Sequence, residues 1–221
     1  MRPLIVIISV AATAACAAPP MGFGTGARLP TSSPGHGVVT GRAGLGVGTG
    51  RQVFQAEASG LFMPARWGAI ELGAVFTRLG QTGADDAHLT LTGGFPYLRP
   101  RLQLGRVSLA IGVAGFALGG GGGGFIGGVA DGQLGYGTRR WSVYLGGTRQ
   151  GFELTAERPV RSSSAQLRVG GEYAIPTGTG SVGVAVELYR TDDTLTSGGT
   201  TIASRGLAGG LKLTVTSPEF R

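Results

Sequence analysis

Apolar and polar residues alternate with a period of two along most of this chain, and no other feature limits its possible folds as strongly. In residues 182–188, Val or Leu occupies every second position, and Gly183, Ala185 and Glu187 lie between them. Successive side chains of a β-strand point to opposite faces, so this segment predicts a strand with one apolar face. The same alternation occurs in residues 141–145, 165–173 and 207–215. The chain is therefore predicted to be all-β.

Composition narrows the class of protein further. The 221 residues suffice for one domain; 44 of them are glycine and only 14% are charged. This low charge and a mean hydropathy of +0.19 argue against disorder, and glycine without a three-residue period argues against collagen. The formal net charge of +7 is almost entirely arginine. Because no basic cluster is interleaved with aromatic residues, an anionic lipid surface is favoured over nucleic acid as the partner.

Residues 1–16 are typical of an export signal, with Arg2, an apolar run over residues 4–12 and small residues after it. The run is too short to cross a bilayer as a helix. Residues 13–16, Thr-Ala-Ala-Cys, resemble a bacterial lipobox, in which the cysteine is lipidated and becomes the new N-terminus. They depart from that pattern at Thr13, and ordinary cleavage after Ala17 is the alternative. Cys16 is the only cysteine, so no disulfide is predicted.

Residues 17–37 are rich in proline and glycine without periodicity and are predicted to be a linker. The alternating region spans 38–215, and residues 216–221 form a short tail. Ten strands are predicted, at 38–48, 51–63, 66–79, 87–103, 106–118, 123–136, 139–149, 163–175, 180–190 and 202–215. Short connections (64–65, 104–105, 137–138, 176–179) alternate with mostly longer ones (80–86, 119–122, 150–162, 191–201), apart from a tight turn at 49–50.

In the strand predicted at 87–103, the apolar residues move from the odd-numbered to the even-numbered positions. Phe95 and Tyr97 follow one parity of apolar residues, whereas Leu98 and Leu102 follow the other. A bulge near residues 96–100 explains this change, and so do two shorter strands. The count of ten strands is therefore open to eight or twelve.

Over residues 38–215 this pattern resembles the small OmpA-like or porin-like β-barrel proteins of the Gram-negative outer membrane. The last strand, with Gly210, Leu213 and Val215, is similar to the terminal signal read by the barrel-assembly machinery, although that signal usually ends on an aromatic residue. The resemblance implies a closed antiparallel up-and-down transmembrane barrel, apolar toward lipid and polar inside. It also implies a monomer in the outer membrane, with its N-terminus in the periplasm, and with outer-membrane lipid, lipopolysaccharide and the assembly machinery as partners. A water-soluble barrel or sandwich on a lipid tether is the alternative.

If the apolar parity faces lipid, the polar parity fills the lumen. Pairing across the turn at 49–50 places Arg42 opposite Glu57, and a four-residue turn at 176–179 places Arg168 opposite Glu187. Such pairs are needed because unpaired buried charges are costly. A structural polar plug is favoured, and the lining of a narrow pore is the alternative. The twelve residues predicted inside are Arg42, Gln55, Glu57, Glu71, Arg99, Arg101, Asp131, Gln133, Arg168, Glu172, Glu187 and Lys212.

Two sets of outward residues are candidate membrane contacts. Trp67, Tyr136 and Trp141 flank short turns, where an aromatic girdle marks the periplasmic interface; ordinary aromatic packing is the alternative. Five arginines continue the lipid-facing parity at the opposite strand ends and are candidates for binding lipopolysaccharide phosphates, unless they only snorkel or belong to loops. These are Arg78, Arg149, Arg161, Arg190 and Arg205.

Material for catalysis is sparse. Of the two histidines, His36 lies in the linker and His88 follows Asp85 and Asp86. No nucleophile can be assigned beside His88, so an enzyme is not predicted; a surface lipid hydrolase using His88 is the alternative. Neither a metal site nor a cofactor is expected. The sequence therefore favours a barrel with a structural or envelope-associated role, with a narrow passive pore as second interpretation.

Overall fold

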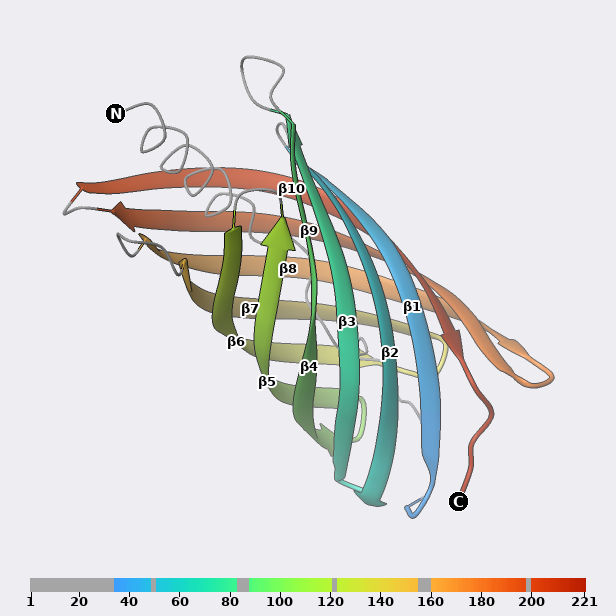
Figure 1. Cartoon of the computed structure of the whole chain (residues 1–221). Helices are drawn as coiled ribbons and strands as arrows, with labels where there is room; N and C mark the ends of the chain where they lie inside the picture. The colour runs from blue at the N-terminus through green and yellow to red at the C-terminus, as the bar shows by residue number, and fades with distance from the viewer. Residues whose placement is uncertain (1–33, 49–50, 83–87, 121–122, 155–159, 198–199) are drawn as a thin grey trace.

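Within the residues that the structure describes, ten antiparallel strands close into one barrel in this computed structural model (Figure 1). The described residues are 34–48, 51–82, 88–120, 123–154, 160–197 and 200–221. Each strand pairs with its neighbours in sequence, and β1 pairs with β10 to close the ring. The predicted fold class is confirmed. The strands are β1 (Gly37–Gly48), β2 (Arg51–Ala65), β3 (Gly68–Thr82), β4 (His88–Leu104), β5 (Val107–Gly120), β6 (Gly123–Gly137), β7 (Trp141–Leu154), β8 (Val160–Thr177), β9 (Gly180–Ser197) and β10 (Thr200–Thr216).

The two ends of the barrel differ. Short turns at 66–67, 105–106, 138–140 and 178–179 lie at the end where β1 begins and β10 ends, which we call the terminal rim. The opposite end is the distal rim. There the strands extend beyond their predicted limits: β9 includes residues 191–197, which were expected to be loop. Thr191, Thr194 and Thr196 suit a β-strand, and pairing with both β8 and β10 holds this segment in the sheet.

β4 is one strand, and the expected bulge or break near residues 96–100 is wrong. Its register with β3 runs unbroken from Gly68 opposite Leu102 to Thr82 opposite His88. Phe95 and Tyr97 are buried in the lumen, so the parity never changes; two aromatic side chains simply point inward. The register shift in this part of the sheet lies instead between β2 and β3, from Phe62 to Ala65.

The barrel is apolar outside and polar inside. On β9, Val186 is 55% exposed whereas the adjacent Glu187 is 3% exposed. All twelve polar residues predicted to line the lumen are buried. Full burial of a Val or Leu side chain is worth roughly 1.5–3 kcal/mol, so a surface with this many exposed aliphatic residues suits lipid rather than water. This is the reverse of the water-soluble alternative. No helix among the described residues is long and apolar enough to cross a membrane.

The tail beyond β10 continues the sheet at the terminal rim. The Ser217 N–H donates to the Val39 carbonyl at 2.8 Å. Gly37 and Phe220 then form an antiparallel bridge, with N···O distances of 2.8 and 2.9 Å. Residues 217–220 therefore extend the β1–β10 seam. Beside them, Val38, Leu61, Met63 and Ala69 form an apolar cluster inside the barrel.

Candidate functional site

Charged side chains of both signs occupy the lumen. Among the described residues, five basic and five acidic side chains gather in its middle part, and none is more than 8% exposed. They come from β1, β2, β3, β4, β6, β8, β9 and β10, because the inward positions of these strands carry them. Their formal charges cancel, as a buried cluster requires. They are Arg42, Arg99, Arg101, Arg168 and Lys212 with Glu57, Glu71, Asp131, Glu172 and Glu187.

One half of this network is built around Tyr97 on β4. The Arg42 guanidinium lies 3.5 Å from Glu57, its cross-strand neighbour. The Tyr97 hydroxyl donates to Glu57 at 2.6 Å and to Glu71 at 3.1 Å. Its ring lies over Gly73, where a Cβ would come within 2.5 Å of the ring. Glycine on β3 thus lets a β4 side chain reach an acid on β2.

The other half is built in the same way around Tyr144 on β7. Its ring lies over Gly170 of β8, where a Cβ would come within 2.6 Å, and its hydroxyl donates to Glu187 of β9 at 2.6 Å. The Lys212 ammonium lies 2.7 Å from the same carboxylate. Tyr189 also donates to Glu187. Glu187 is therefore held by three side chains.

Asp131 on β6 joins the two sides of the lumen. Arg168 of β8 forms a two-pronged contact with its carboxylate, at 2.7 and 3.1 Å. Arg99 of β4 lies 3.4 Å from the same carboxylate and donates to Gln133 at 2.7 Å. Arg99 also lies 3.6 Å from Glu71. Side chains of β4, β6 and β8 thus meet inside the barrel.

Of the two charge pairs predicted from turn lengths, the structure forms one. Arg42 lies opposite Glu57, as predicted. The Arg168–Glu187 pair is wrong: Glu187 lies opposite Gly170, and Arg168 lies opposite Tyr189. β8 continues to Thr177, which pairs with Gly180, so the connection is two residues shorter than expected and the register shifts by two.

Sequence reasoning missed the two tyrosines and the central role of Asp131. Tyr97 and Tyr144 could have been found by one signal. Each is an inward-facing tyrosine, and the neighbouring strand carries an inward-facing glycine. That signal needs the register, which the sequence supplies only where the turn length is certain.

The predicted interface aromatics gather at the terminal rim. Trp67 is exposed in the turn between β2 and β3, and Tyr136 and Trp141 are exposed on the outer face of β6 and β7, with ring centroids 5.7 Å apart. Tyr173, which pairs with Trp141, extends this group and was not predicted. A belt of this kind suits a membrane–water boundary; that role stays a prediction.

The five predicted outer arginines are all exposed toward the distal rim. Four lie on the adjacent strands β7–β10, and Arg78 lies apart on β3. Arg161 lies 3.4 Å from Glu153. Asp192 lies 2.9 Å from Arg205 and 3.8 Å from Arg190. Among the described residues, these arginines lie toward the distal ends of their strands, and Arg190 has the exposed Leu167 and Leu207 as cross-strand neighbours.

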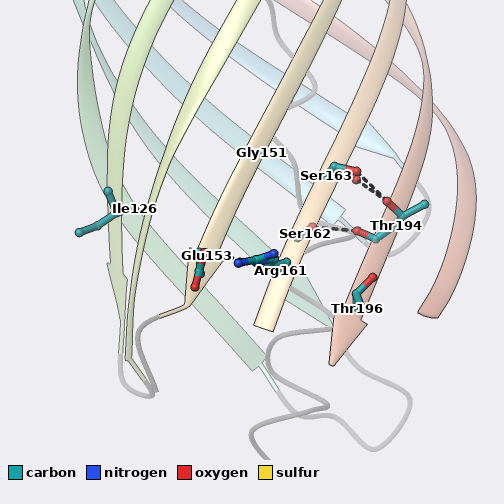
Figure 2. Close-up of a pocket in the computed structure, with 8 residues that line it drawn as sticks. All are labelled: Ile126, Gly151, Glu153, Arg161, Ser162, Ser163, Thr194 and Thr196. Carbon is teal, nitrogen blue, oxygen red and sulfur yellow. Dashed lines mark hydrogen bonds and ion pairs between the residues drawn. The ribbon is translucent and has the colours of Figure 1, made fainter. Parts of the chain in front are cut away.

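A hollow of about 420 Å³ lies beside these arginines on the outer face (Figure 2). The Ser163 and Thr194 hydroxyls hydrogen-bond to each other at 2.7 Å on its wall, and Ser162 donates to the Thr194 carbonyl at 3.2 Å. The hollow combines hydroxyl groups, an ion pair and apolar surface. It is lined by Ile126, Gly151, Glu153, Arg161, Ser162, Ser163, Thr194 and Thr196.

Several predicted residues cannot be placed. Cys16 with the signal segment, the linker up to residue 33, and Asp85 and Asp86 lie outside the described residues. His88 begins β4, but its side chain is not described. At the terminal rim Arg221 donates to His36 at 2.9 Å. Among the residues described, no three His, Cys, Asp or Glu side chains are grouped to hold a metal ion.

Comparison with known proteins yields structural likeness alone. No family model matches the chain, and neither does any curated protein sequence. It is similar to an outer membrane channel from Pseudomonas putida F1, with 11% identity over 85% of this chain and 97% of that one, at a TM-score of 0.46. It is also similar to the translocator domain of the autotransporter NalP from Neisseria meningitidis, with 9% identity over 84% and 89% of the two chains, at a TM-score of 0.42. These likenesses concern the barrel architecture of outer-membrane proteins.

Proposed function

We propose that this chain is a bacterial outer-membrane barrel whose lumen is closed by its own charge network, and that its role is structural or envelope-associated. An inverted antiparallel barrel with short turns at one end suits the outer membrane, with that end in the periplasm. On this orientation the terminal rim faces the periplasm and the distal rim faces outward. An N-terminus lipidated at Cys16 would begin on the periplasmic side.

The observation that carries the proposal is the position of Asp131. Its carboxylate accepts from Arg168 at 2.7 Å and lies 3.4 Å from Arg99, so contacts from β8 and β4 meet on β6. Arg99 is 0% exposed and Glu71 is 1% exposed, so the middle of the network is packed by its own side chains. A ten-stranded barrel is narrow, so long side chains from facing strands suffice to fill it.

Conductance across a planar lipid bilayer tests this proposal. The wild-type barrel should give no discrete openings. A variant with Arg99→Ala, Asp131→Ala and Arg168→Ala removes the central contacts and shortens three side chains that fill the lumen, so it should conduct. The matched control is Glu153→Ala with Arg161→Ala, which removes an ion pair from the outer face and should stay silent. Discrete openings in the wild-type protein would contradict a closed lumen.

A narrow passive pore is the second candidate, and one observation favours it. Toward the distal rim the Gln55 side-chain amide, Gln150 Nε2 and Ser164 Oγ are buried without a hydrogen-bond partner among the described residues. Buried polar atoms normally find a partner, and water in the lumen would supply one. Water-filled space there would be the outer part of a path for small solutes. Swelling of proteoliposomes in small sugars, which should be absent for a closed barrel, separates the two candidates.

A further inference from the structure

Four of the five outer arginines near the distal rim lie together on one side of the barrel, and the fifth, Arg78, lies apart on β3. Arg149, Arg161, Arg190 and Arg205 point outward from β7–β10, and only Glu153 and Asp192 accompany them there among the described side chains. The corresponding outward residues on β1, β2, β4 and β5 are uncharged. They are Val47, Gln52, Thr92 and Ala117. The four arginines therefore form a local basic patch rather than a uniform ring.

Arg149 is the member most open to a ligand. It lies between Ala130 of β6 and Ala165 of β8 in the register, so small side chains flank it on both sides. Within the described part of the chain, no acidic side chain lies within ion-pair distance of it. The N–H groups of a guanidinium in this setting can donate two parallel hydrogen bonds to an oxyanion, and the oxygens of a phosphate group match their geometry.

Gly151 lines the hollow (Figure 2) and is the next outward residue of β7 after Arg149, so the two lie next to each other along this strand. Arg161 stands at its edge with a side chain that is 77% exposed. Ser163 and Thr196 add hydroxyl groups, which suit the hydroxyls of a sugar. A space of about 420 Å³ that combines apolar surface with hydroxyl groups and a guanidinium can take a sugar headgroup.

The surface on the other side of the patch is aliphatic. Leu145, Leu167, Val169 and Leu188 are exposed on β7, β8 and β9 toward the terminal rim. From the distal rim toward the terminal rim, a bound amphiphile would thus contact first the hydroxyl groups and arginines and then the aliphatic side chains. Such an order matches a molecule that carries phosphate on a sugar headgroup with acyl chains attached.

We propose that the outer face of β6–β10 at the distal rim binds a phosphorylated glycolipid of the outer leaflet. Its phosphates lie on Arg149 and Arg161, its sugar enters the hollow, and its acyl chains follow the aliphatic rows. Arg190 and Arg205, which share Asp192, keep the patch positive at its far side. This site rests on the proposed outer-membrane location, but it is independent of whether the lumen is closed.

Binding to purified full-length protein in neutral detergent tests the site. The probes are synthetic diphosphoryl lipid A, monophosphoryl lipid A and the dephosphorylated lipid, titrated by native mass spectrometry. Affinity should fall with each phosphate removed. The Arg149→Gln, Arg161→Gln variant should bind the diphosphoryl lipid at least about tenfold more weakly, which is 1.4 kcal/mol or more. Gly151→Leu fills the hollow without changing charge and should weaken all three lipids.

The matched control is Arg66→Gln with Arg140→Gln, which removes two exposed arginines from the terminal rim and should leave binding unchanged. Equal binding of phosphorylated and dephosphorylated lipid would overturn the site, as would wild-type affinity in the distal double variant. Displacement of the lipid by millimolar inorganic phosphate would show a free-anion site and reject the glycolipid. If the double variant does not fold, the single Arg149→Gln change at an exposed side chain decides the matter. None of these outcomes depends on conductance, so the site and the closed lumen fail separately.

Discussion

Tyr97 and Tyr144 occupy equivalent positions on the two sides of the β1–β10 seam. Each ring lies over a glycine of the next strand toward the seam, and each hydroxyl donates at 2.6 Å to a glutamate one strand further on. Each glutamate in turn contacts the basic residue of the strand at the seam, Arg42 or Lys212. The seam is therefore flanked by two matching chains of contacts.

The first prediction concerns the space beneath Tyr97. In Gly73→Ala the new Cβ would lie 2.5 Å from a ring that two hydrogen bonds hold in place. We expect the free energy of unfolding to fall by about 1–3 kcal/mol, as for overpacked cores. Urea unfolding in lipid vesicles measures this. Gly60→Ala is the control, because a Cβ there meets nothing within 4 Å. Equal stability of the two variants would contradict the role of the glycine.

The second prediction concerns Asp131. In Asp131→Ala, Arg99 and Arg168 lose the carboxylate that they share, so the free energy of unfolding should fall by about 3–5 kcal/mol. Adding Arg168→Met removes one of the two stranded charges and should restore part of this loss. The same unfolding measurement applies. Asp192→Ala, which breaks the exposed pair with Arg205, should change stability by about 1 kcal/mol or less. If Asp131→Ala lowered the free energy of unfolding by no more than Asp192→Ala does, the charges in the lumen would be hydrated and the prediction would be wrong.

A third prediction tests the register between β8 and β9. Val169 lies directly opposite Leu188. Paired Cα atoms are about 4.5–5.5 Å apart, within disulfide range, whereas diagonal neighbours are about 7–8 Å apart. In a Cys16→Ser background, Val169→Cys with Leu188→Cys should oxidise readily, as read by gel mobility. Leu167→Cys with Leu188→Cys, the pair required by a four-residue turn, should stay reduced. The reverse result would restore the Arg168–Glu187 pair.

The fourth prediction places the terminal rim at a bilayer surface. Trp67 and Trp141 are the only tryptophans of the chain, and both lie exposed at this rim. Bromine atoms high on the lipid chains should quench their fluorescence more strongly than bromine near the chain ends. Trp141→Phe isolates Trp67, and Trp67→Phe isolates Trp141. Stronger quenching from the bilayer centre would mean that these residues are not at an interface.

The period-two pattern is sufficient to predict the strands and the direction of their side chains, because the two faces of each strand meet opposite environments. Val186 and Glu187 illustrate this: adjacent in sequence, they lie on opposite faces. The pattern fails where inward residues are themselves apolar, as Phe95 and Tyr97 are on β4. It also fails at strand ends, where threonines at 191–197 suit strand and loop alike.

The contacts inside the lumen depend on register, and register depends on turn length. The two-residue turn at 49–50 is evident from Thr-Gly, so the Arg42–Glu57 pair follows from the sequence. Between β8 and β9, Pro176 and Thr177 also suit a turn, yet both are paired in the sheet. A change of two residues there moves Glu187 from Arg168 to a position opposite Gly170. Register relates only adjacent strands. It therefore cannot predict contacts between strands that are not adjacent, such as the one between Arg99 of β4 and Asp131 of β6.

The pairing of β1 with β10, prolonged by Gly37 and Phe220, has a consequence for biogenesis. On one edge β1 and β10 have only each other as partner, so neither edge is paired until β10, which begins at Thr200, has been made and delivered. Until then the nascent sheet exposes two unpaired edge strands and its aliphatic outer face to water. Because unpaired strand borders and exposed aliphatic surface promote aggregation, we expect a chaperone to cover both until β1 pairs with β10.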